Sequence, residues 1–377
     1  MRFAPRSESR LFAAFLLLTG GLYAAFARTR PVGLCIDDSL YILAARSLLH
    51  GHYINNLLPS RPPLTDPLPG FPLLLAPFVA AVHGHWHWLT ALSMACTLLT
   101  SLGLWNWMRP LAAPLRWLAI PLFAWNPITV QVSSLVVSEP AFLMVVLGVF
   151  WMMSRLKPDA PMSNLMLLGV LAGWSALIRP QGAVLFAAIG IGLAYAGRWK
   201  ALWGVLAVGV VIWGSVLLRN HIVAHTATGY FQHWQATLPA LAQHPGLLWR
   251  NAMSVGRTFI DDNILAIGRP MSGPAKAGEL AIGGWLLYCA ARGVGALAAE
   301  AGAPAVAAMA MFGFFYVLLH TLWLAVDAHY FFPLVPFLLI LALSGARRHR
   351  LAFVVTVIGA TVLLARYVMA DLALVRA

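Results

Sequence analysis

The sequence has few charged residues. They occupy 10% of its 377 positions, whereas hydrophobic residues occupy 61% and the mean hydropathy is +0.80. An ordinary soluble domain carries about a quarter charged residues. The shortage of charge therefore excludes a soluble globular protein of ordinary composition and indicates a polytopic membrane protein.

Cysteines and acidic residues are also scarce. Cys35, Cys96 and Cys289 lie far apart and two of them fall in apolar runs, so neither a disulfide framework nor a thiolate metal site is expected. The 12 acidic residues face 25 lysines and arginines, which gives a net charge of +13. Because the basic residues stand mostly in short clusters between apolar runs, they are typical of topology signals, and nucleic acid is not an expected partner.

The sequence is rich in apolar runs of membrane-spanning character. The expected fold class is an all-α polytopic membrane protein, a single membrane-embedded domain over residues 1–377 with about eleven transmembrane helices. No small-residue cleavage motif follows the first run, so we expect a retained helix there and not a signal peptide. The expected spans are Leu11–Ala27, Trp88–Met108, Trp117–Val130, Pro140–Met153, Leu165–Ile178, Ala183–Gly197, Leu202–Leu217, Leu280–Leu297, Ala303–Leu324, Phe331–Leu343 and Ala352–Val368.

The basic clusters predict the sides of these spans. Arg2, Arg6 and Arg10 precede the first span, which places the N-terminus in the cytoplasm by the positive-inside rule. If the spans then cross the membrane in alternating directions, nearly every basic residue of the short loops is cytoplasmic. Arg179 is the main exception, because it falls in a very short outer turn.

Two long outer loops are expected. The run Phe71–Val82 has only about a dozen residues and contains prolines, so it is too short and too irregular to cross a bilayer of about 30 Å. Residues 28–87 are therefore expected to form one long outer loop with juxtamembrane helices, one of them over Ser39–Leu49. A second long outer loop, rich in aromatic residues and histidine, covers residues 219–279.

Several polar features fall together on the predicted outer side. An ionisable group beside hydrocarbon is costly and indicates a site, and two adjacent carboxylates repel each other as well. One such carboxylate could act as a general base, and an arginine could bind a phosphate with its guanidinium fork. The features are Asp37–Asp38, Ser138–Glu139, Arg179 and Asp327–His329–Tyr330.

Each of these features also has a purely structural explanation. One aspartate could cap the helix Ser39–Leu49, Ser138 could cap the next span, and Arg179 could snorkel from a helix end. The histidines among residues 83–88 alternate with tryptophans, which is more typical of an interfacial aromatic belt than of a metal site. The aspartates at 261–262 are more typical of a solvated loop.

The first outer loop resembles that of a known enzyme class. It contains Asp-Asp-x-x-Tyr-x-x-x-Ala over residues 37–45, then His50–Gly51 and the segment Arg61–Leu64, which includes Pro-Pro-Leu. This order is similar to the first outer loop of GT-C glycosyltransferases, namely protein O-mannosyltransferases and lipid A aminoarabinose transferases. In these families an arginine usually precedes the last conserved tyrosine, whereas His329 precedes it here. Further matching segments are Ser138–Glu139, Leu177–Pro180, Leu218–Asn220 and His329–Pro333.

The resemblance implies a GT-C-like bundle and a membrane glycosyltransferase. Such an enzyme moves a mannose-like sugar, or another hexose or pentose, from a polyprenyl-phosphate donor to an acceptor hydroxyl of a glycan, lipid or protein. Transfer occurs with inversion at the outer face of the cytoplasmic (inner) membrane. The resemblance implies Asp37 as the catalytic base beside Asp38, and a divalent metal could bind this acidic pair. It implies substrate-binding roles for Tyr41, Arg61, Glu139, Arg179, His329 and Tyr330.

Two other classes of function compete with this interpretation. A transporter or lipid flippase should place charges near mid-membrane and interrupt helices in paired halves. Here the charges gather at one face instead, which favours the enzyme. A non-catalytic partner in envelope glycan assembly is the second alternative, and the sequence offers no feature against it.

Overall fold

The computed structural model describes residues 6–33, 36–109, 113–157, 160–265, 274–323, 326–347 and 350–376. Within these ranges the chain forms helices and loops, with one isolated β-bridge between Ile54 and Pro63. The all-α prediction is therefore confirmed. Cys35 lies outside the described residues, while Cys96 and Cys289 are buried free thiols.

Seven helical segments of the described chain are long and apolar enough to cross a membrane, so the protein is an integral membrane protein. One of them is interrupted by a short 3₁₀ turn, which joins α15 to α16. The segments correspond to α1 (Arg6–Arg28), α4 (Thr90–Trp107) with the preceding turn Trp86–Leu89, α10 (Trp199–Ala224), α13 (Pro274–Ala301), α14 (Ala303–Thr321), α15 to α16 (Ala328–Phe331 and Val335–Ala346) and α17 (Arg350–Arg376).

Further apolar helices are shorter than a full span. They include segments where we expected spans, so the predicted number of about eleven transmembrane helices stays a prediction. The run Phe71–Val82 forms one of these helices, as the sequence suggested. The shorter helices are α3 (Gly70–Ala81), α5 (Ala113–Ala124), α7 (Glu139–Ser154), α8 (Met162–Ile178) and α9 (Ala183–Tyr195).

The expected span Trp117–Val130 is wrong in extent. Helix α5 ends at Ala124, and a separate helix α6 covers Pro127–Ser133. Asn126 has extended backbone geometry, and its side chain accepts a hydrogen bond from the Ile128 N–H, so it caps α6. A residue before proline avoids the helical region, and asparagine followed by proline is a favoured helix start. The sequence Asn126–Pro127 therefore indicates the break between α5 and α6.

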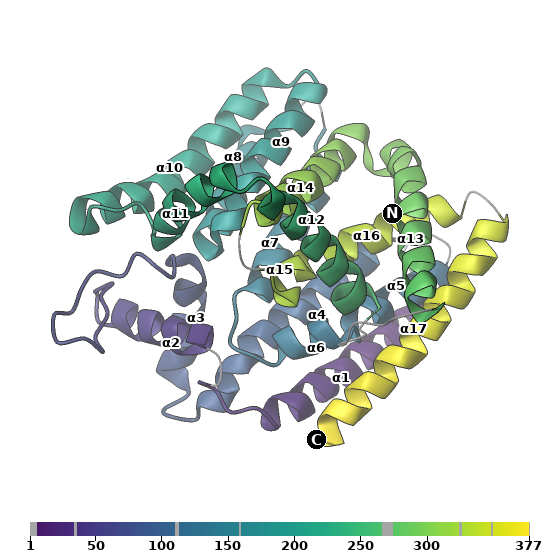
Figure 1. The fold of residues 1–377 in the computed structure, drawn as a ribbon, viewed down its shortest axis with the longest axis horizontal. Coiled ribbons are helices and arrows are strands. Elements are labelled where there is room, and N and C mark those ends of the chain that lie inside the picture. The colour runs from purple at the N-terminus through teal and green to yellow at the C-terminus, as the bar shows by residue number, and fades with distance from the viewer. Residues whose placement is uncertain are drawn as a thin grey trace.

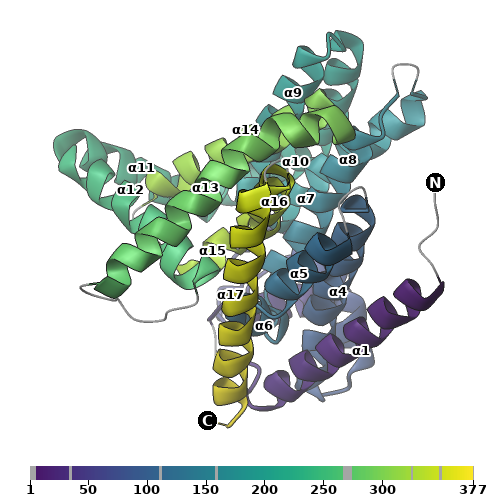
Figure 2. The same cartoon turned by 90° about the vertical axis from the view of Figure 1, so that its right-hand side faces the viewer.

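The predicted outer loops contain helices of their own. Helix α2 (Ile36–Leu49) packs beside α3 in the first loop, and the two lie together at the lower left of Figure 1. Helix α10 continues to Ala224 into the second loop. Two further helices follow there, α11 (Gly229–Gln243) and α12 (Gly246–Thr258), and a π-helical turn continues over Phe259–Ile264. Figure 2 shows α17 crossing the outside of the bundle, where it packs against α5 and α16.

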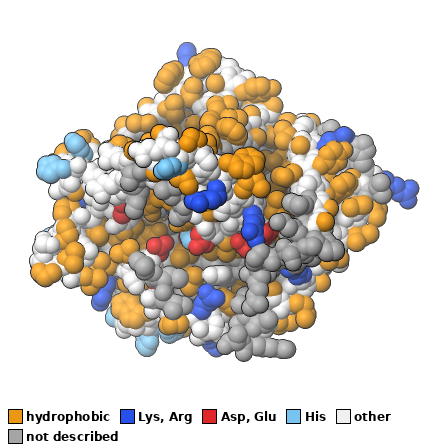
Figure 3. Space-filling view, viewed as in Figure 1, with side chains coloured by type: hydrophobic (Ala, Val, Ile, Leu, Met, Phe, Trp, Pro, Cys, Tyr) orange, Lys and Arg blue, Asp and Glu red, His pale blue; other side chains and the backbone are white. Residues whose placement is uncertain are grey.

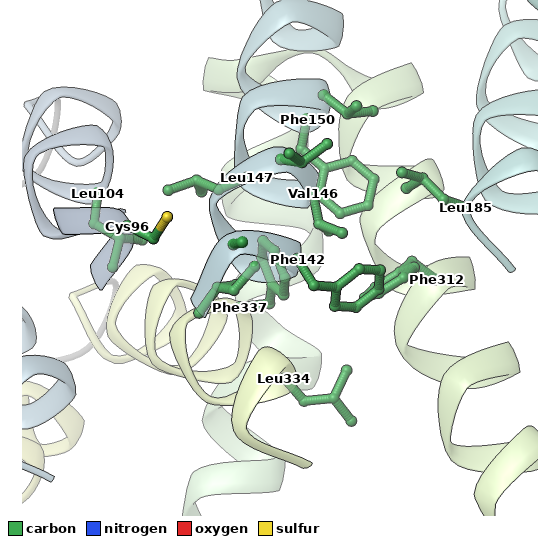
Figure 4. Close-up of a cluster of buried hydrophobic side chains, with 14 of the residues drawn as sticks. Cys96, Leu104, Phe142, Val146, Leu147, Phe150, Leu185, Phe312, Leu334 and Phe337 are labelled. Atoms are coloured by element: carbon green, nitrogen blue, oxygen red, sulfur yellow. The ribbon is translucent and has the colours of Figure 1, made fainter. Parts of the chain in front are cut away.

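Helix α7 runs through the centre of the core. Its side chains Phe142, Val146 and Phe150 point toward Phe312 of α14 and Phe337 of α16, as Figure 4 shows. The rings of Phe150 and Phe337 have centroids 5.3 Å apart in an edge-to-face arrangement. A helix that is apolar on every side is expected at the centre of a bundle. The first residue of α7 is Glu139, so the core carries a carboxylate at one of its ends.

Contacts between loops agree with the predicted grouping of the cytoplasmic segments. Arg116 pairs with Glu8 at 2.8 Å, which joins the start of α1 to α5. Arg198 donates a hydrogen bond to the Leu156 carbonyl at 3.1 Å. Both contacts join segments that the basic clusters assign to the same side of the membrane.

Candidate active site

A cavity of about 160 Å³ lies where the predicted outer segments meet. Its walls come from α2, from the turn between α8 and α9, from α11, and from the ends of α14 and α15. Figure 3 shows acidic and basic side chains gathered across the middle of one face of the molecule, with apolar side chains around them. The cavity is lined by Asp37, Tyr41, Arg179, Pro180, Gln181, Tyr230, Trp234, Leu319, His320, Trp323 and Tyr330.

The two aspartates of the acidic pair have different surroundings. Asp38 is 1% exposed, and its carboxylate accepts hydrogen bonds from the backbone N–H groups of Gly33 at 2.9 Å and Ser39 at 2.8 Å. Asp37 is exposed and faces the cavity. Asp38 therefore fixes the start of α2, and Asp37 is the carboxylate that a substrate could reach.

This arrangement does not suit a metal ion shared by the pair. Both oxygens of Asp38 accept hydrogen bonds from backbone N–H groups, whereas Asp37 lines the cavity. Among the residues that the structure describes, no group of three or more His, Cys, Asp or Glu side chains could hold a metal ion. We therefore assign no step to a metal at this site.

The surroundings of Asp37 make it a stronger base. Burial raises the pKa of its carboxyl above the ordinary value, and the negative charge of Glu139 raises it further. Arg179 and His329 act in the opposite direction, but the net direction is upward. A carboxylate with a raised pKa accepts a proton from a hydroxyl more readily than an ordinary aspartate does.

A buried ion pair forms the floor of the site. Arg179 Nη1 lies 2.5 Å from Glu139 Oε1, and the two residues are only 7% and 2% exposed. Burial acts to lower the pKa of Arg179, but the Glu139 carboxylate beside it keeps that pKa raised, so the guanidinium stays charged. Arg179 is thus buried and paired, which rejects the snorkelling explanation.

Ser138 connects this ion pair to the first outer loop. Its hydroxyl accepts a hydrogen bond from Arg179 Nη1 at 3.1 Å and is 2.8 Å from the Tyr41 hydroxyl. The Ser138 side chain makes no capping bond to α7. The capping explanation for Ser138 is therefore wrong, and the hydroxyl instead holds Tyr41 and Arg179 in place.

The backbone around Arg179 is fixed by close packing. Helix α8 ends at Ile178, Arg179 is extended, and Pro180 opens a short 3₁₀ turn. The first residue of α3, Gly70, lies so close to the backbone of Leu177 and Ile178 that a Cβ would collide with it. Only glycine allows this approach, and it joins the first outer loop to the segment that carries Arg179.

The third part of the site comes from the segment before α16. His329 Nδ1 lies 2.8 Å from Asp327 Oδ1, and His329 Nε2 lies 3.6 Å from Glu139 Oε1. The hydrogen bond from His329 lowers the pKa of Asp327 below its ordinary value. The ring of Tyr330 faces the guanidinium of Arg179, with 6.0 Å from its centroid to Cζ. His329 therefore extends the charged cluster toward the surface.

Three buried polar atoms of the site have no hydrogen-bond partner among the described residues. They are Glu139 Oε2, Arg179 Nε and Gln181 Oε1. A buried polar atom without a partner costs about 1–3 kcal/mol. Arg179 and Gln181 line the cavity and Glu139 pairs with Arg179, so these three atoms lie next to the cavity.

Four of the eight predicted site residues line the cavity, namely Asp37, Tyr41, Arg179 and Tyr330. Glu139 and His329 lie beside it through their contacts with Arg179 and with each other, and Asp38 caps α2. Arg61 lies apart from the cavity. It lies in an exposed turn with a positive φ of 45°, and it is not part of the cavity lining. Other lining residues escaped the sequence analysis, although the aromatic character of the second outer loop pointed to that loop. The missed residues are Gln181, Tyr230, Trp234, His320 and Trp323.

The helical bundle, which has a charged cavity at one end, is similar in fold to solved structures of a membrane protein. The chain resembles the crystal structure of ArnT from Cupriavidus metallidurans bound to undecaprenyl phosphate, with a TM-score of 0.61 and 17% identity over 92% of this chain. It also resembles the apo state of that ArnT, with a TM-score of 0.53 and 15% identity over 91% of this chain. No family model matches the chain, and no curated protein matches its sequence.

The similarity covers only part of the ArnT chain. The alignments include 61% and 60% of that chain, so this protein spans about three fifths of its length. At such low identity the comparison establishes a shared fold. The GT-C-like fold that the motifs of the first outer loop implied is thereby confirmed.

Proposed function

We propose that this protein is a membrane glycosyltransferase that takes a sugar from a polyprenyl-phosphate donor. The observation that carries the proposal is the cavity in which Asp37 and the buried Arg179 lie on adjoining walls at one end of a GT-C-like bundle. The similarity to ArnT bound to undecaprenyl phosphate supports this class of donor. The sugar is a hexose or pentose, such as a mannose-like sugar, and the acceptor is a hydroxyl of a glycan, lipid or protein.

The reaction is a single displacement at the anomeric carbon. Asp37 takes the proton from the acceptor hydroxyl, whose oxygen forms a bond to the anomeric carbon. The bond between that carbon and the phosphate oxygen breaks, and its electron pair leaves with the lipid phosphate. Arg179 stabilises the charge on this leaving group. A single displacement inverts the anomeric configuration.

The residues around Arg179 prepare it for this role. Glu139 and the Ser138 hydroxyl both hold Nη1, whereas Nε has no partner among the described residues. The guanidinium also lines the cavity. A guanidinium has five N–H donors. Those that Glu139 and Ser138 do not use can therefore bind a phosphate while the ion pair keeps the side chain in one orientation.

The proposal includes a location. We place the N-terminus in the cytoplasm and the cavity at the outer face of the cytoplasmic membrane, in agreement with the basic clusters. The donor lipid then reaches the cavity from the bilayer, and the acceptor comes from the cell envelope. In this arrangement the protein takes part in the synthesis of an envelope glycan.

The test begins with the lipids of a deletion strain. We expect a polyprenyl-phosphate sugar to accumulate, which identifies the donor by mass spectrometry. The purified protein in nanodiscs should then convert this lipid to free polyprenyl phosphate when an envelope extract supplies the acceptor. Transport across a membrane cannot be scored in nanodiscs, so an unchanged donor would favour the flippase and contradict the enzyme.

A further inference from the structure

Helix α11 forms the aromatic wall of the cavity, although it belongs to the second outer loop. It contributes Tyr230 and Trp234 to the lining. Their rings lie 6.0 Å and 5.6 Å from the ring of Trp323. The wall therefore depends on where α11 is held, and α11 is a surface helix outside the core.

The start of α11 is held by a carboxylate from the first outer loop. The Asp66 carboxylate lies against the first residue of α11, since a Cβ on Gly229 would collide with Asp66 Oδ2. The backbone N–H groups of Gly229 and Tyr230 act on this carboxyl and lower its pKa. These N–H groups have no acceptor within the helix, and a negative charge at a helix N-terminus is favourable. Thr228 caps the following turn by accepting from the Phe231 N–H at 3.2 Å.

Gly229 is required for this contact. A Cβ at position 229 would collide with Asp66 Oδ2, and it would lie 3.2 Å from Asp66 Cγ. Any other residue at 229 would therefore displace the carboxylate or the helix. Gly246 makes a useful comparison, because it is the first residue of α12 and a Cβ there would meet nothing within 4 Å.

The segment around Asp66 is itself anchored to α10. Arg219 donates hydrogen bonds to the carbonyls of Leu64 at 2.7 Å and Tyr53 at 3.0 Å. The Tyr53 hydroxyl donates to the Pro67 carbonyl. Burial raises the pKa of Asp66 to about 6, although the two N–H donors oppose this rise. The segment that carries Asp66 is therefore held against α10 by Arg219.

We infer that Asp66 is a positioning residue for the aromatic wall of the cavity. Its carboxylate fastens α11 to the first outer loop, so Tyr230 and Trp234 keep their places only while this contact is made. The first loop then supplies both the base, Asp37, and the anchor of the facing wall. The contact between Asp66 and α11 does not depend on the proposed function. Only the identity of the ligand, a polyprenyl phosphate, rests on it.

Hydrogen exchange of the full-length protein in nanodiscs tests the contact itself. We expect Asp66→Ala and Gly229→Ala each to speed exchange along α11 by about tenfold or more, the effect of losing a hydrogen bond to a charged group. The double variant should exchange no faster than either single variant, since both act on one contact. Gly246→Ala is the matched control and should leave α12 unchanged. Unchanged exchange in α11, or additive effects in the double variant, would overturn the inference.

Binding of undecaprenyl phosphate to the same samples tests the consequence. The Kd should rise about tenfold in Asp66→Ala and Gly229→Ala with little change in Tm, and Asp66→Asn should recover most of the affinity because an amide oxygen still accepts from an N–H. Gly229→Ala keeps Asp66, so it remains informative if Asp66→Ala fails to fold. Faster exchange without weaker binding would overturn the positioning role. Failure of the wild type to bind undecaprenyl phosphate would instead contradict the proposed function.

Discussion

At the residue scale, the acidic pair shows how two neighbouring side chains come to have different surroundings. Consecutive residues on a helix are rotated by about 100° around its axis, so their side chains point in different directions. Asp38 turns inward to the N–H groups of Gly33 and Ser39, and Asp37 turns to the cavity. A capped helix start thus presents a reactive carboxylate at a fixed position.

The pH dependence of activity should report the charge of Glu139. Asp37 must be ionised to act as a base, so kcat/KM falls as the pH drops through its raised pKa. Glu139→Gln removes a negative charge that raises this pKa, and it leaves the charge of Arg179, which lowers it. The loss of the Glu139 charge lowers the pKa of Asp37, so the acid limb of the kcat/KM profile should move to lower pH. An acid limb that stays in place or moves to higher pH would contradict this electrostatic link.

Arg179 has two roles, because it pairs with Glu139 and is proposed to bind the donor phosphate. Substituting Arg179 and Glu139 together separates these roles. Removing Arg179 alone leaves the buried Glu139 with His329, 3.6 Å away, as its remaining ion-pair partner. Breaking a buried ion pair in this way costs up to about 3–5 kcal/mol of stability. The double variant Arg179→Gln with Glu139→Gln removes both charges and keeps hydrogen-bonding groups of similar shape. If Arg179 binds the phosphate, this double variant should fold but lose at least about tenfold in affinity for undecaprenyl phosphate. Arg179→Lys should retain part of the affinity, because lysine keeps the charge and loses the fork.

If the double variant binds undecaprenyl phosphate with the wild-type affinity, Arg179 serves only its ion pair with Glu139. Thermal unfolding in detergent provides the control, since the Tm of the double variant should be closer to the wild type than that of Arg179→Ala. Binding and stability are then measured on the same preparation.

At the element scale, the site depends on the contact between the start of α3 and the end of α8. The close approach of Gly70 to Leu177 and Ile178 places the first outer loop against the residue before Arg179. The Tyr41–Ser138 hydrogen bond adds a second link, between α2 of the first loop and the start of α7. The first loop thereby behaves as part of the bundle.

Gly70→Ala should weaken this junction. The added Cβ has no room against a backbone, so we expect a loss of about 1–3 kcal/mol in stability, with a loss of sugar transfer larger than the loss of folded protein. Gly256→Ala is a suitable control, because its Cβ would meet nothing within 4 Å. Equal Tm and activity in the two variants would show that α3 can move without cost.

At the scale of the whole molecule, the proposal requires that the charged cavity and the second outer loop lie outside the cytoplasm. A topology reporter fused after Arg155 should report the cytoplasm, and one fused within Thr226–Gln243 should report the outer face. The physical reason is the distribution of basic residues, which holds short basic loops in the cytoplasm. The reverse pattern would place the cavity on the wrong side for an envelope acceptor.

Much of this organisation was accessible from the sequence because it follows from local signals. Apolar runs predicted the helices. The polar residues at their ends predicted a grouping in which Asp37 and Arg179 line one cavity and Glu139 pairs with Arg179. The break at Asn126 was missed because a long apolar run outweighed the signal of a residue before proline. The anchor between Asp66 and Gly229 could not be predicted, since it joins two loops distant in sequence and depends on their packing.

The central claim is that Asp37 is the base of a sugar transfer, and the initial rate of that transfer tests it most directly. Purified Asp37→Asn and Asp38→Asn should be compared with the wild type, using the donor lipid that accumulates in the deletion strain. Asparagine cannot take the proton, so Asp37→Asn should lose about 10²–10⁴ in rate with an unchanged Tm. Asp38→Asn should lose about 1 kcal/mol of stability, because one of its two backbone hydrogen bonds is lost, and keep most of the rate. Transfer at the wild-type rate by Asp37→Asn would contradict the account.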